Sequence, residues 1–300
     1  MNKNELLDGY LYRVDKLRAS EYGYLIPSKD KIIDNINTFV QNIVYFEDDN
    51  PDTLYLGRDC KGLREPKNKT IYIRNSLDQP LKDITTFHEF HHAAQTNPLT
   101  NNVGINQHDN VGRLIMEAQT QYFAEFGLYC PLHNIEPFAE RCIPSSDLRM
   151  DAGGTVVSGL HNYEQYDALL SKLALFLGVS KDFFVCINFA YDEGMKVFKK
   201  LFDSLPNPPF GFDLLLFVLD YYYAVDLIQY VDNLDKETLL SGGETRPYAG
   251  FGRLSRGHQY KLITAFDSEV YKWLKDIDLE RARSFHRYIL DDLFRGSILP

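Results

Sequence analysis

Residues 85–95 read TTFHEFHHAAQ, and this segment constrains the fold more than any other part of the chain. It places three of the chain's eight histidines within five residues. If the segment is helical, His88 and His92 project from the same face, one turn apart. Two imidazoles at this spacing can bind one cation at the distance of about 2 Å that Zn–N bonds require. The spacing therefore predicts a helix that forms part of a metal site.

Glu89 follows the first of these histidines, which gives the pattern H-E-x-x-H. On a helix its side chain points beside the metal instead of at it. From there its carboxylate can accept a proton from metal-bound water, whose pKa the metal lowers to about 7. Glu89 is therefore predicted to be the general base of a hydrolytic reaction.

The alternative interpretation of this segment is an ordinary helix with partly exposed histidines. Phe87, Phe90, Ala93 and Ala94 flank the motif, and they predict a helix that is packed into the core. Burying three imidazoles without partners is costly. The metal site is therefore the favoured interpretation.

The neighbouring segments predict where this helix lies in the chain. Residues 70–74 (TIYIR) alternate and are rich in β-branched and aromatic residues, which predicts a strand. Pro80 suits the first turn of a helix that runs to about Gln95 and ends at Asn97-Pro98. A second helix is predicted over about residues 111–127. Strand 70–74 is also a candidate sheet edge, to which a peptide substrate would add as a further strand.

A tetrahedral catalytic zinc needs a third protein ligand and one position free for water. The predicted second helix offers two carboxylates. Glu117 is embedded in the apolar sequence LIMEA, where a carboxylate without a partner would be costly to bury. Glu125 lies two turns further on, nearer the predicted end of the helix. Glu117 is the preferred third ligand, and Glu125 is the alternative.

This order of elements resembles a known family. A strand, a helix with H-E-x-x-H and a glutamate on the following helix are together similar to the gluzincins, the zincin metallopeptidases whose third ligand is a glutamate. A narrower resemblance, to ImmA/IrrE-type peptidases, is carried by Glu117-Ala118, Phe123-Ala124, Leu128 and Pro131. The resemblance covers about residues 40–131.

The resemblance implies a compact α+β domain with an intracellular role, which binds zinc and cleaves a protein or peptide substrate. It implies that His88, His92 and Glu117 bind the zinc and that Glu89 is the general base.

The chain departs from the family pattern at two positions. Gln121 stands where many gluzincins carry an acidic residue that orients the first histidine ligand. His91 stands where a small residue is more common. The sequence also has no recognisable repressor-like DNA-binding module.

The predicted fold class is α+β, with two domains. Residues 1–155 are expected to form a zincin-like metallopeptidase domain, with a small sheet and the motif helix. Its strands are predicted at residues 42–46, 53–56 and 70–74. Residues 156–300 are expected to form a mainly helical domain packed against the first, with helices at 163–177, 183–205, 212–233 and 256–274.

Zinc peptidases commonly use a tyrosine or histidine to hydrogen-bond the developing oxyanion. His161 and Tyr163 are candidates because they follow the break at Gly153-Gly154. His108, in the loop between the two motif helices, and Tyr122, on the second of them, are alternatives.

The chain carries a net charge of −10 and has a pI near 5.3, which gives no general electrostatic reason to bind nucleic acid or an anionic membrane. The best candidate for a membrane span, residues 210–231, is interrupted by Asp213, Asp220 and Asp226.

The start of the chain lacks the apolar core of a secretory signal, and the four cysteines form no CxxC pair. A cytoplasmic protein is expected, and nothing in the sequence specifies its oligomeric state.

The sequence favours a zinc-dependent metallopeptidase over two alternatives. A zincin-like scaffold without catalysis would act as a binding or regulatory protein, but a structural metal site needs no base such as Glu89. Glu89 and His92 also form the E-x-x-H unit of di-iron carboxylate bundles. Such a site needs a second E-x-x-H, and the chain has none. A hydrolase that acts on a substrate other than a peptide stays open.

Overall fold

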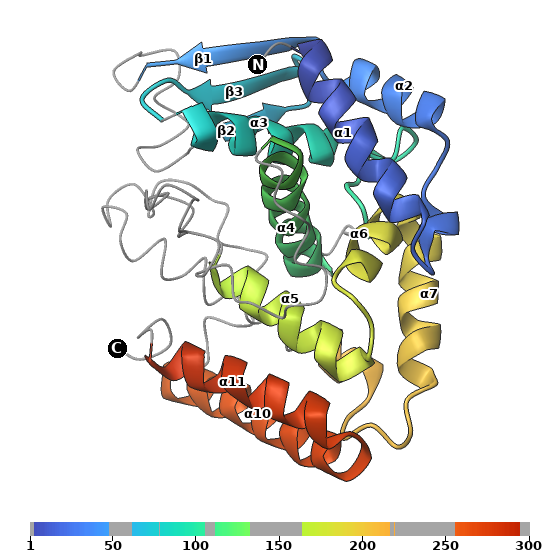
Figure 1. Ribbon diagram of the computed structural model, residues 1–300, viewed down its shortest axis with the longest axis vertical. Coiled ribbons are helices and arrows are strands. Elements are labelled where there is room, and N and C mark those ends of the chain that lie inside the picture. Colours follow the sequence, from blue (N-terminus) through green and yellow to red (C-terminus); the bar gives the residue numbers. More distant parts are fainter. Residues whose placement is uncertain are drawn as a thin grey trace.

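The computed structural model describes residues 3–47, 62–77, 79–105, 112–132, 164–216, 219 and 256–294. Within these residues the chain is mostly helical, with one small three-stranded sheet (Figure 1). The predicted α+β class is confirmed at this level. The predicted domain boundary at residue 155 lies outside the described residues.

The N-terminal half supplies the sheet and the helices around it. Its elements are α1 (Lys3–Arg18), the short 3-10 helix η1 (Gly23–Leu25), α2 (Lys29–Phe39), β1 (Asn42–Phe46), β2 (Gly62–Glu65), β3 (Thr70–Arg74), α3 (Gln79–Ala94) and α4 (Arg113–Leu132). The predicted strands 42–46 and 70–74 and both motif helices are confirmed. The predicted strand 53–56 lies outside the described residues.

The described part of the C-terminal half is helical. Its helices are α5 (Glu164–Leu177), α6 (Asp182–Phe189), α7 (Tyr191–Asp203), α10 (Arg256–Ile277) and α11 (Leu279–Phe294). The prediction of one helix over residues 183–205 is wrong, because the chain turns between α6 and α7 and Tyr191 takes a φ of +52°. Gly194 permits this turn, since a Cβ there would lie 1.9 Å from the Ile187 carbonyl oxygen.

β3 is the central strand of the sheet, which has the order β1-β3-β2. It pairs in parallel with β1 and antiparallel with β2. The expectation that residues 70–74 form the sheet edge is therefore wrong, and among the described strands the edges are β1 and β2. Ile71 and Ile73 are fully buried, because β3 has a strand on each side and a helix across one face.

Helix α3 lies along β2 and β3 (Figure 1). β2 lies close to α3 at Gly62, where a Cβ would lie 2.4 Å from Cγ2 of Thr85. A side chain does not fit at this distance, so the approach depends on glycine. It brings the backbone of β2 next to the H-E-x-x-H motif.

Helix α4 packs against α3 and runs from it toward the C-terminal helices (Figure 1). α6 holds the loop that leaves α3 at Ile105. The Asn188 side chain accepts a hydrogen bond from the Ile105 backbone N–H at 3.1 Å and donates one to the Phe184 carbonyl at 2.7 Å. The position of α4 relative to α3 is thus supported by an element from the other half of the chain.

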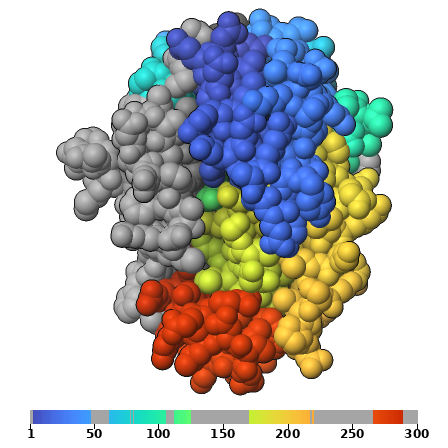
Figure 2. Space-filling model, turned by 45° about the vertical axis from the view of Figure 1, so that its right-hand side comes forward, coloured from blue at the N-terminus to red at the C-terminus, as the bar shows by residue number. Residues whose placement is uncertain are grey.

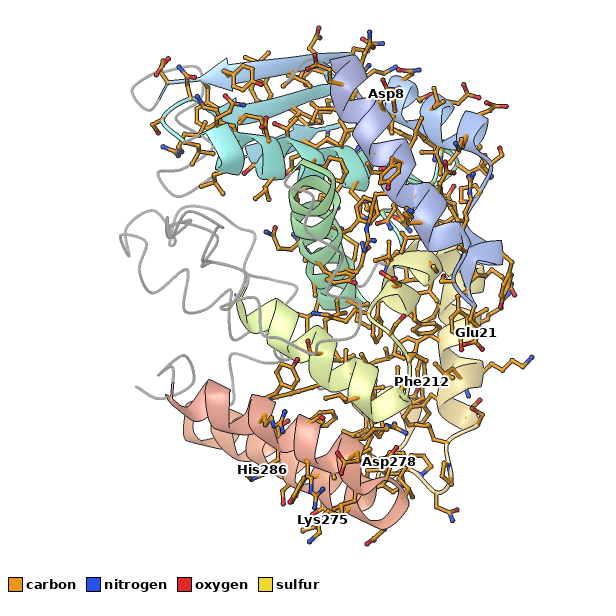
Figure 3. All side chains as sticks on the ribbon, viewed as in Figure 1. Asp8, Glu21, Phe212, Lys275, Asp278 and His286 are labelled. Atoms are coloured by element: carbon orange, nitrogen blue, oxygen red, sulfur yellow. The ribbon has the colours of Figure 1, made fainter. Side chains whose placement is uncertain are left out.

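One cluster of buried apolar residues runs from α1 through α3 and α4 to α10 and α11. Phe212, labelled in Figure 3, lies in its aromatic part, with ring centroids 5.1 Å from Phe198 and 5.4 Å from Phe202. Figure 2 shows α1 and α2 at one end of the molecule and α10 and α11 at the other, with α5 between them. None of the described helices has both the length and the apolar character needed to cross a bilayer.

Candidate metal centre

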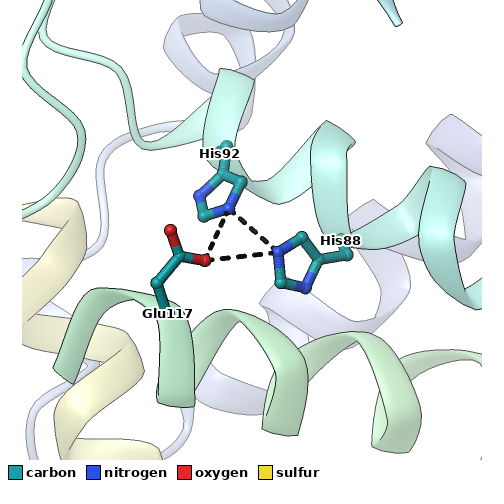
Figure 4. A group of neighbouring side chains, drawn as sticks. All are labelled: His88, His92 and Glu117. Atoms are coloured by element: carbon teal, nitrogen blue, oxygen red, sulfur yellow. Dashed lines mark hydrogen bonds and ion pairs between the residues drawn. The ribbon is translucent and has the colours of Figure 1, made fainter. Parts of the chain in front are cut away.

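His88, His92 and Glu117 meet where α3 packs against α4 (Figure 4). The Nε2 atoms of His88 and His92 lie 3.0 Å apart. Oε2 of Glu117 lies 3.5 Å from Nε2 of His88 and 3.3 Å from Nε2 of His92. In a tetrahedral site with bonds of about 2.0–2.1 Å, neighbouring ligand atoms are about 3.3 Å apart. The three atoms therefore have the spacing of one face of such a tetrahedron, and they could hold a metal ion.

The packing of the two helices explains this convergence. His88 and His92 are buried on one face of α3, one turn apart. The Glu117 side chain, which is 17% exposed, faces them from α4 between the buried Leu114 and Ala118. The structure thus brings together the two histidines and the preferred third ligand. Glu125 lies on the same helix, but its side chain is outside the described part of the chain.

The electrostatics of the three residues favour a cation. Burial alone would lower the pKa of His88, but the hydrogen bond to Glu117 and the charges of Glu89 and Glu117 raise it. Burial alone would raise the pKa of Glu117, but His92 and His88 hold that pKa well below its usual range. Glu117 is therefore an ionised carboxylate, and its charge is directed at the two Nε2 atoms.

Gln121 orients the first histidine. Its Oε1 lies 3.0 Å from Nδ1 of His88, on the ring edge away from Glu117. Since an amide oxygen only accepts, Nδ1 carries a proton, and Nε2 is the ring atom that can offer a lone pair once a cation takes the place of its proton. Gln121 thus orients the ring through a neutral group. Nδ1 of His92, by contrast, is buried and has no hydrogen-bond partner among the described residues.

Glu89 is buried beside the ligands and is held by the sheet. The backbone N–H of Arg64, on β2, donates to Oε2 of Glu89 at 3.0 Å. Since Gly62 lets β2 lie close to α3, the spacing between strand and helix sets this contact. No described hydrogen bond engages Oε1, so one oxygen of the carboxylate is fixed and the other is available. No sequence pattern points to Arg64, which lies 25 residues from Glu89 along the chain.

His91 belongs to the core and not to the ligand set. It is fully buried, and its ring stacks on Phe123 with centroids 4.1 Å apart. Nε2 lies 3.0 Å from Oε1 of Gln119, and Nδ1 lies 2.7 Å from the Tyr10 hydroxyl. Because Gln119 Oε1 accepts, Nε2 carries the proton and Nδ1 accepts from Tyr10. The three histidines of the motif therefore divide into two candidate ligands and one neutral core residue.

The structure describes only one of the remaining predicted site residues, Tyr122. His161, Tyr163 and His108 lie outside the described residues, so their predicted role in stabilising the oxyanion stays a prediction. The Tyr122 hydroxyl donates to Oδ1 of Asp182 on α6 at 3.1 Å. This contact engages its hydroxyl with α6.

Comparisons of the chain with protein-family models, with curated proteins and with solved structures found no match. The functional assignment therefore depends on the geometry and chemistry of the site itself.

Proposed function

We propose that the chain is a zinc-dependent metallopeptidase of the gluzincin type. His88, His92 and Glu117 hold the zinc, and Glu89 is the general base. The observation that carries this proposal is the triangle of ligand atoms, with sides of 3.0, 3.3 and 3.5 Å, beside a carboxylate that has one oxygen fixed and one available.

The ligand set supports zinc as the ion and catalysis as its role. Two histidines and one glutamate are a ligand set of catalytic zinc sites, which keep a fourth position open, whereas structural sites use four protein ligands. Among the described residues this is the one group of three such side chains close enough to share a cation. A bound zinc would supply Lewis acidity, which brings the pKa of a water molecule to about 7 and polarises a carbonyl group.

Glu89 supplies the proton transfers. Its free Oε1 accepts the proton of the attacking water and then donates it to the leaving amine. The Arg64 N–H keeps the carboxylate oriented during both transfers, because it holds Oε2 and leaves Oε1 to act. A site without catalysis has no use for a carboxylate held in this way, which counts against the alternative of a binding or regulatory protein.

The adjacent sheet edge favours a peptide as substrate. β2 is an edge of the described sheet and lies beside the motif helix, and its outward Arg64 N–H is already bound to Glu89, so a peptide would pair with the other outward groups of the strand. An extended peptide beside such an edge is bound through its backbone and needs no specific sequence. An extended peptide bound along β2 would have its scissile bond near the metal. A compact substrate could not bind along the strand in this way.

The first experiment measures metal content per chain by mass spectrometry. The wild-type protein is expected to bind about one zinc, and His92→Ala and Glu117→Ala to bind much less. Glu89→Gln is expected to keep the fold and the zinc while losing cleavage of a peptide library.

A well-folded wild-type chain that binds no supplied zinc would overturn the proposal. Zinc binding without cleavage in the wild type would instead favour the binding or regulatory alternative. Loss of zinc in His92→Ala but not in Glu117→Ala would move the third ligand to Glu125 or another residue.

A further inference from the structure

Among the described residues, no anion pairs with the positively charged side chain of Arg64, which lies beside the candidate metal centre. It lies on the same face of β2 as Gly62, the face toward α3, because side chains alternate along a strand. The side chain is half-buried, and its guanidinium lies 5.8 Å above the ring of Phe39. Nη1 is buried without a hydrogen-bond partner, and no carboxylate of the described residues lies within ion-pair distance.

The guanidinium also interacts with the base of the proposed reaction. Burial lowers the pKa of Arg64, and the negative charge of Glu89 opposes this. The contact that orients Glu89 is made by the Arg64 backbone, however, and not by its guanidinium. The side chain therefore needs another explanation than the positioning of Glu89.

A charge count at the metal-bound site points to an anion. The ion contributes two positive charges, and the carboxylates of Glu117 and Glu89 balance them. The ligand histidines are neutral when they bind a metal. The positive charge of Arg64 is then not balanced by a described carboxylate. A partly desolvated charge without a partner is unfavourable. A guanidinium binds a carboxylate through two parallel hydrogen bonds, which makes a substrate carboxylate the fitting partner.

We propose that Arg64 binds a carboxylate of the substrate, so that the enzyme selects peptides with an acidic group close to the scissile bond. This inference rests on the proposed peptidase function. The group is either the C-terminal carboxylate of the peptide or the side chain of an aspartate or glutamate.

Two metal-chelating probes test the inference without turnover. Succinic acid monohydroxamate carries a chelating end and a free carboxylate, and its amide-capped form is identical except for that carboxylate. Both are titrated by calorimetry into the zinc-bound full-length chain. The wild type is expected to bind the carboxylate probe about tenfold more tightly than the capped probe. Arg64→Gln is expected to bind both probes with the affinity that the wild type has for the capped one.

Two further variants control for folding and for net charge. Arg64→Met keeps an apolar stem against Phe39 and is expected to behave as Arg64→Gln. Arg74→Gln removes a positive charge from β3, where the guanidinium lies 5.3 Å above Phe46, and is expected to keep the tenfold preference.

The outcomes separate this inference from the proposed function. Equal affinity of the wild type for both probes, or a preference that survives in Arg64→Gln and Arg64→Met, overturns the role of Arg64 alone. An equal loss of affinity for both probes in these variants also overturns the role of Arg64 in binding a carboxylate, because such a loss indicates a structural role. A zinc-bound chain that binds neither probe argues against an open catalytic zinc, and the inference then falls with the proposed function.

Two peptide pairs then identify the source of the carboxylate. One pair differs only in a free or amidated C-terminus, and the other in an internal Glu or Gln. The pair that shows the tenfold difference in kcat/KM in the wild type, and not in Arg64→Gln, names the group that Arg64 binds.

Discussion

At the scale of single residues, the two candidate histidine ligands differ in what holds them. Nδ1 of His88 is hydrogen-bonded to Gln121, whereas Nδ1 of His92 has no partner among the described residues. The direction of the His88 ring is thus set by α4 before a metal binds. The direction of the His92 ring is set by its packing and by the metal itself.

Replacing Gln121 is expected to weaken zinc binding without unfolding the chain. In Gln121→Leu, Nδ1 of His88 loses this acceptor, and affinity for zinc is expected to fall by about 10- to 100-fold. Gln121→Glu keeps an acceptor and is expected to bind zinc at least as tightly as the wild type. Competition with a chromophoric chelator measures the zinc affinity of both variants. Unchanged affinity in Gln121→Leu would show that this contact does not tune the site.

The buried His91 makes stability depend on pH. Burial lowers its pKa well below 6.5, although the hydrogen bond to Gln119 opposes this. The unfolded chain therefore binds a proton below about pH 6.5 that the folded chain excludes. The contribution of His91 to stability is present above pH 6.5 and is lost as the pH falls.

Relative to His91→Gln, the wild type is expected to lose up to about 1.4 kcal/mol of unfolding free energy per pH unit below about pH 6.5. Urea unfolding of the metal-free proteins across this range measures the difference. Every other titratable group is present in both proteins, so the difference between the two profiles isolates His91. Parallel pH profiles would contradict a neutral His91.

The site residues were predictable to different degrees. His88 and His92 follow from helical spacing alone, and Glu117 follows from the cost of a carboxylate within an apolar run. Arg64 and Tyr10 are not predictable in this way. They reach Glu89 and His91 from other elements, and only tertiary packing brings them there.

At the scale of elements, the distance between β2 and α3 controls Glu89. In Gly62→Ala the new Cβ would lie 2.4 Å from Cγ2 of Thr85, so β2 must move away from α3. The hydrogen bond from Arg64 N–H to Glu89 then lengthens. Turnover is expected to fall about tenfold, because the base is no longer held in position. Zinc content is expected to stay the same.

A second substitution tests this explanation. Thr85→Ser removes Cγ2, the atom in conflict, and in the Gly62→Ala background it is expected to restore most of the turnover. Gly9→Ala is the matched control, since a Cβ on Gly9 meets nothing within 4 Å. If Thr85→Ser does not restore turnover, or if Gly9→Ala loses turnover to a similar extent, the spacing between β2 and α3 does not explain the loss in Gly62→Ala.

The elements were predictable where the local pattern was strong. β3 and α3 have regular apolar periods, and both were predicted. β2 was not, because its sequence GLRE has no β-branched residue and the strand depends on pairing with β3. The central position of β3 could not be inferred without knowing β2. The turn between α6 and α7 depends on Gly194, which a continuous helical period conceals.

At the scale of the whole molecule, the two halves share contacts as well as a hydrophobic cluster. Asp182 of α6 accepts hydrogen bonds from Arg13 of α1 at 3.3 Å and from Tyr122 of α4 at 3.1 Å. The Val185 carbonyl accepts one from Gln95, just after α3, at 3.4 Å. The candidate metal centre therefore depends on helices that lie far beyond the motif in sequence.

A buried ion pair far from the metal tests this dependence. Nζ of Lys172 on α5 lies 3.0 Å from Oδ2 of Asp267 on α10, and the two side chains are 2% and 8% exposed. Asp267→Ala removes this partner of a buried ammonium, and it is expected to cost about 3–5 kcal/mol. Thermal unfolding followed by circular dichroism, with zinc release as a second signal, is expected to show one transition at a lower temperature.

Glu269→Ala is the matched control on the same helix. It removes an exposed pair with Lys272 and is expected to change stability by less than about 1 kcal/mol. Two separate transitions in Asp267→Ala, with zinc released only in the second, would contradict shared unfolding. They would support the two domains that the sequence predicts over residues 1–155 and 156–300.

The two hydrogen bonds of His91 also bear on how quickly the proposed site would take up an ion. Tyr10 and Gln119 hold this ring from α1 and α4, so α3 cannot rotate about its axis without breaking both contacts. The backbone at His88 and His92, on an adjacent face of the same helix, is therefore held in place whether or not the proposed site is filled. Uptake by the proposed site is then expected to be limited by the loss of water from the incoming ion and not by a rearrangement of the helix. A chain stripped of zinc should regain it in a single fast phase.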